Sequence, residues 1–168
     1  MSGPFKPLEM GDREVFHRCF REDPPDGSEM TFTNLFMWRH RYRPFWCQRE
    51  GCLLLLCRPP ERPPFGLPPA GGGDKRAALQ ALFEEHRPEV VMHLAAQADV
   101  TRALANPLGT FEANVRGTYV LLECARRLWE GEDGPHAMVV ASSDKAYGRH
   151  EHLPYREDDE LLGLYPYD

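Results

Sequence analysis

The sequence predicts an α/β protein in which a partial parallel sheet in the C-terminal half is joined to a small α+β subdomain. The apolar runs Val90–Leu94 and Ala137–Ala141 support this prediction, since such runs are typical of strands buried on both faces. Between them, Leu108–Trp129 carries a helical period. Strand, helix and strand with polar strand ends form half of a nucleotide-binding sheet, whose ligands lie beyond the carboxyl ends of the strands.

The N-terminal elements follow from caps and turn chemistry. Asp12 is suited to cap a helix that runs to about Arg21, and Ser28 a second helix that ends near Tyr42, before Pro44. Two strands, Phe45–Gln48 and Cys52–Cys57, are then joined by a turn at Glu50-Gly51, which predicts a hairpin.

Prolines and glycines predict the boundary between two domains. The proline-dense segment Arg58–Pro69 is expected to be irregular, and Ala70–Gly73 a flexible joint. We therefore expect domains at residues 1–73 and 74–168. Asp74 begins a helix to about His86 that suits either domain, so the junction lies within it.

The C-terminal half continues with short helices and a loop. Thr101–Ala105 predicts a short helix, and Asn106-Pro107 supplies a cap and a first-turn proline for the long helix. Tyr147–Asp168 is expected to be mostly loop, with an acidic cluster at Glu157–Glu160.

Composition excludes several kinds of partner and site. The net charge of −6 argues against nucleic acid, and no apolar run has membrane-spanning length. Five cysteines without a C-x-x-C pair suggest a reducing, cytoplasmic location. Cys47, Cys52 and Cys57 are spaced as strand residues rather than as metal ligands, so we expect no metal site.

Five motifs recur in one order in the C-terminal half: His93–Gln97, Thr110–Thr118, Ser142–Gly148, Pro154–Asp158 and Pro166-Tyr167. In this order and spacing they resemble the extended short-chain dehydrogenase/reductases, which have a Rossmann-like domain. Within that family the chain resembles the nucleotide-sugar 4,6-dehydratases and epimerases over about residues 75–168. Its Ser-Asp-Lys form is similar to CDP-glucose 4,6-dehydratase.

The resemblance implies an NAD-dependent lyase or epimerase acting on a nucleotide sugar. Tyr167 would be the catalytic tyrosine, and Ser143 would hydrogen-bond the sugar hydroxyl. Asp144 would be the acid that protonates the leaving hydroxyl, and Lys145 would stand where other dehydratases place a glutamate. A homodimer is also consistent with the resemblance.

The resemblance also implies a set of cofactor-binding residues: Leu94, Ala95, Ala96, Gln97, Asn114 and Ser142. The first four would approach NAD through their backbone. Asn114 could equally have the structural role of tying the helix to the strand ends. We interpret His93 as a packed strand residue, because the sequence identifies no partner for it.

Two departures from the family pattern leave open whether the chain is an enzyme. The glycine-rich phosphate loop is expected upstream of Val90, but Gly71-Gly72-Gly73 lacks its spacing and a preceding strand. The lysine that accompanies Tyr167 would come four residues later, beyond Asp168. We therefore expect these 168 residues alone to be inactive. A gene fusion, a truncated reading frame and a constructed sequence each fit this pattern.

The N-terminal half has a resemblance of its own. Ser28–Arg39, the hairpin and Pro64–Pro69 resemble the start of a bacterial family related to the C-terminal acyltransferase-like domain of phosphatidylglycerol lysyltransferase. Two alternatives to a dehydratase or epimerase part therefore stay open: a remnant acyltransferase-like module, and a non-catalytic structural or interaction protein.

Overall fold

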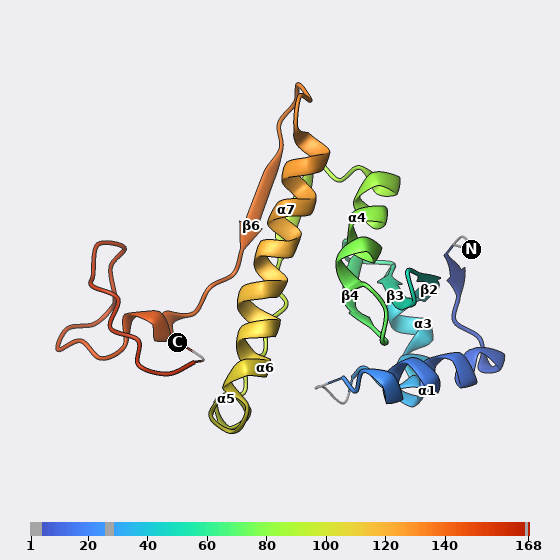
Figure 1. Ribbon diagram of the computed structural model, residues 1–168, viewed down its shortest axis with the longest axis horizontal. Coiled ribbons are helices and arrows are strands. Elements are labelled where there is room, and N and C mark those ends of the chain that lie inside the picture. The colour runs from blue at the N-terminus through green and yellow to red at the C-terminus, as the bar shows by residue number, and fades with distance from the viewer. Residues whose placement is uncertain (1–4, 26–28, 167) are drawn as a thin grey trace. The chain divides into compact units, whose positions relative to one another are not determined.

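The computed structural model describes residues 5–25, 29–166 and 168, and the chain forms two compact units that divide between Arg87 and Pro88 (Figure 1). This division lies at the C-terminal end of the helix that the sequence places at the junction, whereas we expected a boundary at its N-terminal end, after Gly73. The assignment of residues 1–73 and 74–168 to different families stays a prediction.

The N-terminal unit contains an antiparallel sheet in the order β1-β2-β3-β4. Its strands are β1 Lys6–Pro7, β2 Pro44–Arg49, β3 Cys52–Cys57 and β4 Phe65–Ala70. The predicted hairpin is confirmed as β2 and β3. Glu50 and Gly51 form its turn with φ values of 48° and 74°, the left-handed conformation that two-residue hairpin turns need.

Strand β4 corrects the expectation that the proline-dense segment is irregular throughout. It pairs with β3 through Leu53↔Ala70 and Leu55↔Leu67, with a register shift between these pairs. Pro68 and Pro69 lie within the shift. Proline lacks a backbone N–H, so an edge strand with a bulge is where a sheet accommodates it.

Two of the described α-helices of this unit begin at side-chain caps, one of them at the predicted residue. The helices of the unit are η1 Met10–Asp12, α1 Arg13–Glu22, α2 Phe32–Met37, α3 Arg39–Tyr42 and α4 Lys75–His86. The proposed cap Ser28 lies outside the described residues, and the Thr31 hydroxyl accepts the Asn34 N–H at the start of α2. The predicted single helix is divided at Trp38. The Asp74 cap is confirmed, since its carboxylate accepts the Ala77 N–H at 3.0 Å.

Asp12 does not cap α1 with its side chain, contrary to the sequence-based interpretation. Its carboxylate is buried and accepts hydrogen bonds from Lys6 Nζ at 2.6 Å, the Glu9 N–H at 2.9 Å and Trp46 Nε1 at 2.9 Å. The carboxylate therefore connects β1, η1 and β2, and it lies beside the main hydrophobic core. That core comprises Leu8, Phe16, Cys19, Met30, Phe32, Leu35, Trp46, Leu53, Leu55 and Ala70.

The glycine-rich segment after β4 is packed, not a flexible joint. Ala70 and Gly71 are buried, and the Asp74 N–H donates to the Glu50 carbonyl at 3.0 Å. A Cβ on Gly73 would overlap that same carbonyl oxygen. The absence of side chains thus lets this segment lie directly on the hairpin turn, and the glycines serve close approach rather than mobility.

All five cysteines are buried and none forms a disulfide. Burial raises the pKa of the Cys57 thiol to about 11, so this thiol is protonated at neutral pH and unreactive. The interpretation of the strand cysteines as small core residues agrees with this burial.

The C-terminal unit is built on the predicted strand–helix–strand pattern (Figure 1). Its strands β5 Val90–His93 and β6 Ala137–Val140 are parallel neighbours with Val90 opposite Ala137, which confirms that prediction. The connecting helices are α5 Val100–Ala105, α6 Pro107–Phe111, η2 Glu112–Arg116 and α7 Gly117–Trp129, and η3 Asp144–Tyr147 follows β6. Helix α7 is held to the sheet by Trp129 Nε1, which donates to the Pro88 carbonyl at 2.9 Å.

The two strands are not buried on both faces, contrary to the expectation from their apolar sequence. Val90 is 55% exposed and Met92 is 68% exposed, whereas His93 is buried. Among the described residues of this unit, α7 covers one face of the pair, and no second layer covers the other. No described helix in either unit is both long enough and apolar enough to cross a membrane.

Candidate functional site

The predicted site residues follow two parallel strands whose carboxyl ends lie at the same edge. His93 pairs with Val140 at the end of the register, and the Ala141 N–H donates to the His93 carbonyl at 3.0 Å. Leu94–Gln97 therefore leave β5 beside the point where Ala141–Lys145 leave β6. This is the edge at which open α/β sheets bind ligands.

Asn114 ties the segment after β5 to the long helix. Its side-chain Oδ1 accepts the Gln97 N–H at 2.7 Å, and its Nδ2 donates to the Gln97 carbonyl at 3.1 Å. One amide thus satisfies both backbone groups of Gln97. The Gln97 side chain in turn bonds both backbone groups of Asp99, which caps α5. The structural role suggested for Asn114 is confirmed, and its cofactor-binding role stays a prediction.

Replacing Asn114 with alanine is expected to destabilise the C-terminal unit by about 1–3 kcal/mol, because two hydrogen bonds of about 0.5–1.5 kcal/mol each are lost. Urea unfolding measures the loss, and hydrogen exchange of the Gln97 amide locates it. Glu112→Gln, at an exposed position on the same helical run, is the matched control and should stay within about 0.5 kcal/mol of the parent. Equal stability of the two variants would contradict the role assigned to Asn114.

His93 has a partner that the sequence did not reveal, which corrects that part of its interpretation. Its Nε2 lies 3.2 Å from the Thr118 hydroxyl, and that hydroxyl donates to the Asn114 carbonyl at 2.6 Å. Since the hydroxyl proton is already used, His93 Nε2 carries the proton that it donates to Thr118. Burial lowers the pKa of His93, so the ring is neutral at pH 7 and locks the strand to α7.

The residues after β6 form a short polar turn. Ser143 Oγ accepts the Lys145 N–H at 3.1 Å and so begins η3. Its own hydroxyl proton stays available for a ligand oxygen. Ser142, Asp144 and Lys145 are exposed at this turn. The structure thus places these four predicted residues on one segment, whereas Tyr167 lies outside the described residues.

The loop that follows η3 is held back against that turn. The Tyr155 ring stacks on Tyr147 with 5.1 Å between centroids, and its hydroxyl donates to the Gly148 carbonyl at 2.9 Å. The Gly163 N–H donates to the Ala146 carbonyl at 3.0 Å. The loop therefore begins and ends next to the turn Ser142–Lys145, which is the predicted sugar-binding turn.

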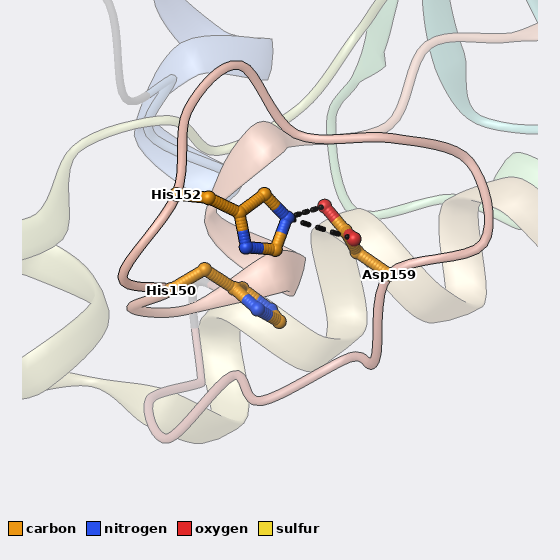
Figure 2. Close-up of side chains that lie close together, drawn as sticks. All are labelled: His150, His152 and Asp159. Atoms are coloured by element: carbon orange, nitrogen blue, oxygen red, sulfur yellow. Dashed lines mark hydrogen bonds and ion pairs between the residues drawn. The ribbon is translucent and has the colours of Figure 1, made fainter.

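A cluster within this loop was missed by the reasoning from sequence. One ring nitrogen each from His150 and His152 and one carboxylate oxygen of Asp159 all lie within 4.8 Å of one another (Figure 2). The available signal was the His-x-His spacing followed by the acidic cluster. The expectation of no metal site depends on cysteine spacing alone, and this cluster contains no cysteine.

Comparison with known proteins places the C-terminal half among nucleotide-sugar enzymes. The sequence profile of the family described as GDP-mannose 4,6 dehydratase matches residues 73–168. A dTDP-glucose 4,6-dehydratase of Shigella flexneri is 36% identical over 92 residues, which are 52% of this chain and 26% of the relative. A probable UDP-glucuronate 4-epimerase of Rhizobium meliloti is 38% identical over 95 residues, which are 55% of this chain and 26% of the relative.

Among solved structures, UDP-glucose 4-epimerase from Brucella ovis in complex with NAD is similar to 55% of this chain. The identity is 30%, the TM-score is 0.48, and the match covers 27% of that chain. The present chain thus spans about a quarter of the length of the curated relatives that it matches.

Proposed function

The chain belongs to the GDP-mannose 4,6 dehydratase family through residues 73–168, and we propose that its C-terminal unit supplies part of an NAD-dependent nucleotide-sugar site. In this proposal the segment after β5 lies along the cofactor, and the turn after β6 contacts the sugar. The proposed activity is that of a 4,6-dehydratase or epimerase. It requires the other elements of such a site, including a glycine-rich phosphate loop and the lysine that accompanies the catalytic tyrosine.

The observation that carries the proposal is the common edge at which both segments leave the sheet. Leu94, Ala95 and Ala96 are exposed there, and two of them have the smallest chiral side chain. A flat ligand can therefore approach their backbone closely, which is what NAD requires at a strand end. Asn114 and Gln97 hold this backbone in place before any ligand arrives, so its ordering costs little on binding.

The polar turn after β6 suits the handling of sugar hydroxyls. We assign Ser143 to hydrogen-bond the reacting hydroxyl and Asp144 to protonate the hydroxyl that leaves. Lys145 lies two residues beyond Ser143 and presents a positive charge beside the same substrate. Tyr167 is proposed to take the proton of the sugar hydroxyl, by resemblance alone. When bound, NAD supplies the chemistry of a reversible hydride acceptor.

The residues of this chain account for only part of an NAD-binding site, because the element that contacts the pyrophosphate is not among them. NAD binding in such sheets depends strongly on a glycine-rich turn, where backbone N–H groups and a helix N-terminus meet the pyrophosphate. The sequence contains no G-x-x-G-x-x-G. Each charge-assisted hydrogen bond that is missing is worth roughly 1.5–3 kcal/mol, so the 168-residue chain should bind NAD weakly.

We expect no heat of NAD binding at micromolar cofactor and no 4-keto-6-deoxy product from a nucleoside-diphosphate glucose. At millimolar NAD, amide NMR shifts should appear at Leu94–Gln97, and a nucleoside-diphosphate glucose should shift Ser143–Lys145. Titration calorimetry, a product assay and ¹⁵N-resolved NMR test these points. Asn114→Ala should weaken the shifts at the first segment, whereas Glu112→Gln should leave them unchanged.

Two results would contradict the proposal. Micromolar binding by the parent chain would show that other residues hold the cofactor. If NMR shifts were confined to the N-terminal unit, or if none appeared at millimolar ligand, the ends of β5 and β6 would not be the binding site. In that case the non-catalytic alternative would stand.

A further inference from the structure

The loop between η3 and the end of the chain carries a donor set that the dehydratase chemistry does not use. His150 and His152 are two residues apart, and Asp159 reaches them from the other side of the loop (Figure 2). Two imidazoles and a carboxylate form the mixed nitrogen–oxygen set that zinc and other divalent transition metals prefer. A loop without strands or helices of its own brings these three groups together.

The distances within the cluster are close to those of a coordination shell. His152 Nε2 lies 3.1 Å from both carboxylate oxygens of Asp159. Around a tetrahedral Zn²⁺ with ligands at about 2.0–2.1 Å, neighbouring ligand atoms are roughly 3.3–3.4 Å apart. The His152–Asp159 pair therefore already has nearly the spacing of two ligands, and the ion would replace the proton that Nε2 donates to the carboxylate, which is released to solvent. The ligand atoms of all three residues lie within 4.8 Å of one another, so His150 has to approach the other two ligands when an ion binds.

Hydrogen bonds to the backbone orient His150 and Asp159 in the way that second contacts orient metal ligands. His150 Nε2 lies 2.9 Å from the Glu160 carbonyl. A hydrogen bond to a carbonyl puts the proton on Nε2 and the lone pair on Nδ1, and metal-bound histidines characteristically have such a second contact. Asp159 Oδ2 accepts the Arg156 N–H at 2.7 Å. This hydrogen bond orients the carboxylate as a contact of this kind orients a metal ligand.

One side of the cluster is open. The His152 side chain is 55% exposed, whereas that of Asp159 is 11% exposed. A hollow of about 370 Å³ adjoins both, lined also by Leu153, Pro154, Arg156 and Asp158. Three protein ligands and an open side match a site that leaves a fourth position for water or a small anion.

We propose that His150, His152 and Asp159 bind a divalent transition-metal ion of the zinc type. The ion joins residues 150 and 152 to residue 159 within the loop that lies against the turn Ser142–Lys145. The simpler alternative is an ion pair between His152 and Asp159 with no metal. The two differ in whether His150 takes part, because the ion pair involves only His152 and Asp159.

Titration calorimetry of the full 168-residue chain with ZnCl₂ tests the proposal. We expect saturable binding of one ion per chain, weakened at least about tenfold by His152→Ala, Asp159→Asn and His150→Ala alike. His40→Ala removes an exposed histidine of α3 in the other unit and is the matched control, which should bind as the parent does. Zinc-induced NMR shifts of the His150 and His152 ring protons give a second readout.

The proposal is overturned if the parent chain does not bind Zn²⁺, or if the three loop variants bind it as well as His40→Ala. Far-UV circular dichroism checks that each variant is folded. Asp159→Asn keeps the side-chain shape, so it decides the matter if an alanine variant is misfolded. Loss of binding in the folded Asp159→Asn and His150→Ala variants together supports the metal site, and unchanged binding in both refutes it.

Discussion

Replacing Phe16 with alanine is expected to destabilise the N-terminal unit by about 3–5 kcal/mol. Phe16 is fully buried, and its ring makes edge-to-face contacts with Phe20, Phe32 and Trp46 at centroid distances of 5.3–5.8 Å. The substitution removes a large apolar side chain and leaves a cavity that the flanking rings cannot fill without leaving their rotamers. It also removes the centre of an aromatic cluster that joins α1, α2 and β2.

Urea unfolding at neutral pH measures this loss. Phe16→Leu should cost less, because it leaves a smaller cavity, and Met10→Ala at an exposed position of the preceding turn should change stability by less than about 0.5 kcal/mol. A loss for Phe16→Ala as small as that for Met10→Ala would show that the aromatic cluster is not the core of this unit.

Replacing Asp12 with alanine is expected to cost about 2–4 kcal/mol, because it breaks a buried hydrogen-bond network and leaves the Trp46 indole N–H without its acceptor. Asp12→Asn keeps the shape but removes the charge, so its cost should be smaller. Glu14→Gln removes a charge of the same sign from an exposed position on α1 and is the matched control.

The pH dependence provides a second measurement on the same variants. Burial by itself raises the pKa of Asp12, but hydrogen bonds from Lys6, the Glu9 N–H and Trp46 lower it further than burial raises it. The folded-state pKa is therefore below the unfolded value of about 3.9. The stabilisation is complete above that value and is lost as the pH falls through the folded-state pKa. The gap between the parent and Asp12→Asn should thus shrink from pH 7 to pH 3. A gap independent of pH would contradict the role of the charge.

Local chemistry accounts for the parts of the fold that the sequence predicted. The hairpin turn at Glu50-Gly51 requires two left-handed residues, and glycine supplies one of them. The caps at Asp74 and Asn106 each accept an N–H three residues ahead, a bond that depends only on the intervening backbone. The parallel pairing of β5 with β6 follows from two apolar runs and one connecting helix.

The candidate site was likewise predicted from the sequence only in part. The order of motifs placed Gln97, Asn114 and Ser143 in one family pattern, and the structure brings Gln97 and Asn114 into direct contact. Ligand binding by these residues, and the catalytic assignments of Asp144, Lys145 and Tyr167, stay predictions. The acyltransferase-like resemblance of the N-terminal half also stays a prediction.

By itself the sequence determined the strands β2, β3, β5 and β6, the helix starts at Asp74 and Asn106, and the family of the C-terminal half. These features depend on residues a few positions apart or on motif order. Only the tertiary structure decided that Asp12 is buried under Trp46, that Gly73 lies on the hairpin turn, and that β4 tolerates its prolines at an edge. It also decided that Met92 is exposed, and that ligand atoms of His150, His152 and Asp159 lie close together. Each of these outcomes depends on which distant segment packs against a residue. A local sequence pattern indicates which kind of contact a side chain favours, but the contact itself is set by the tertiary structure.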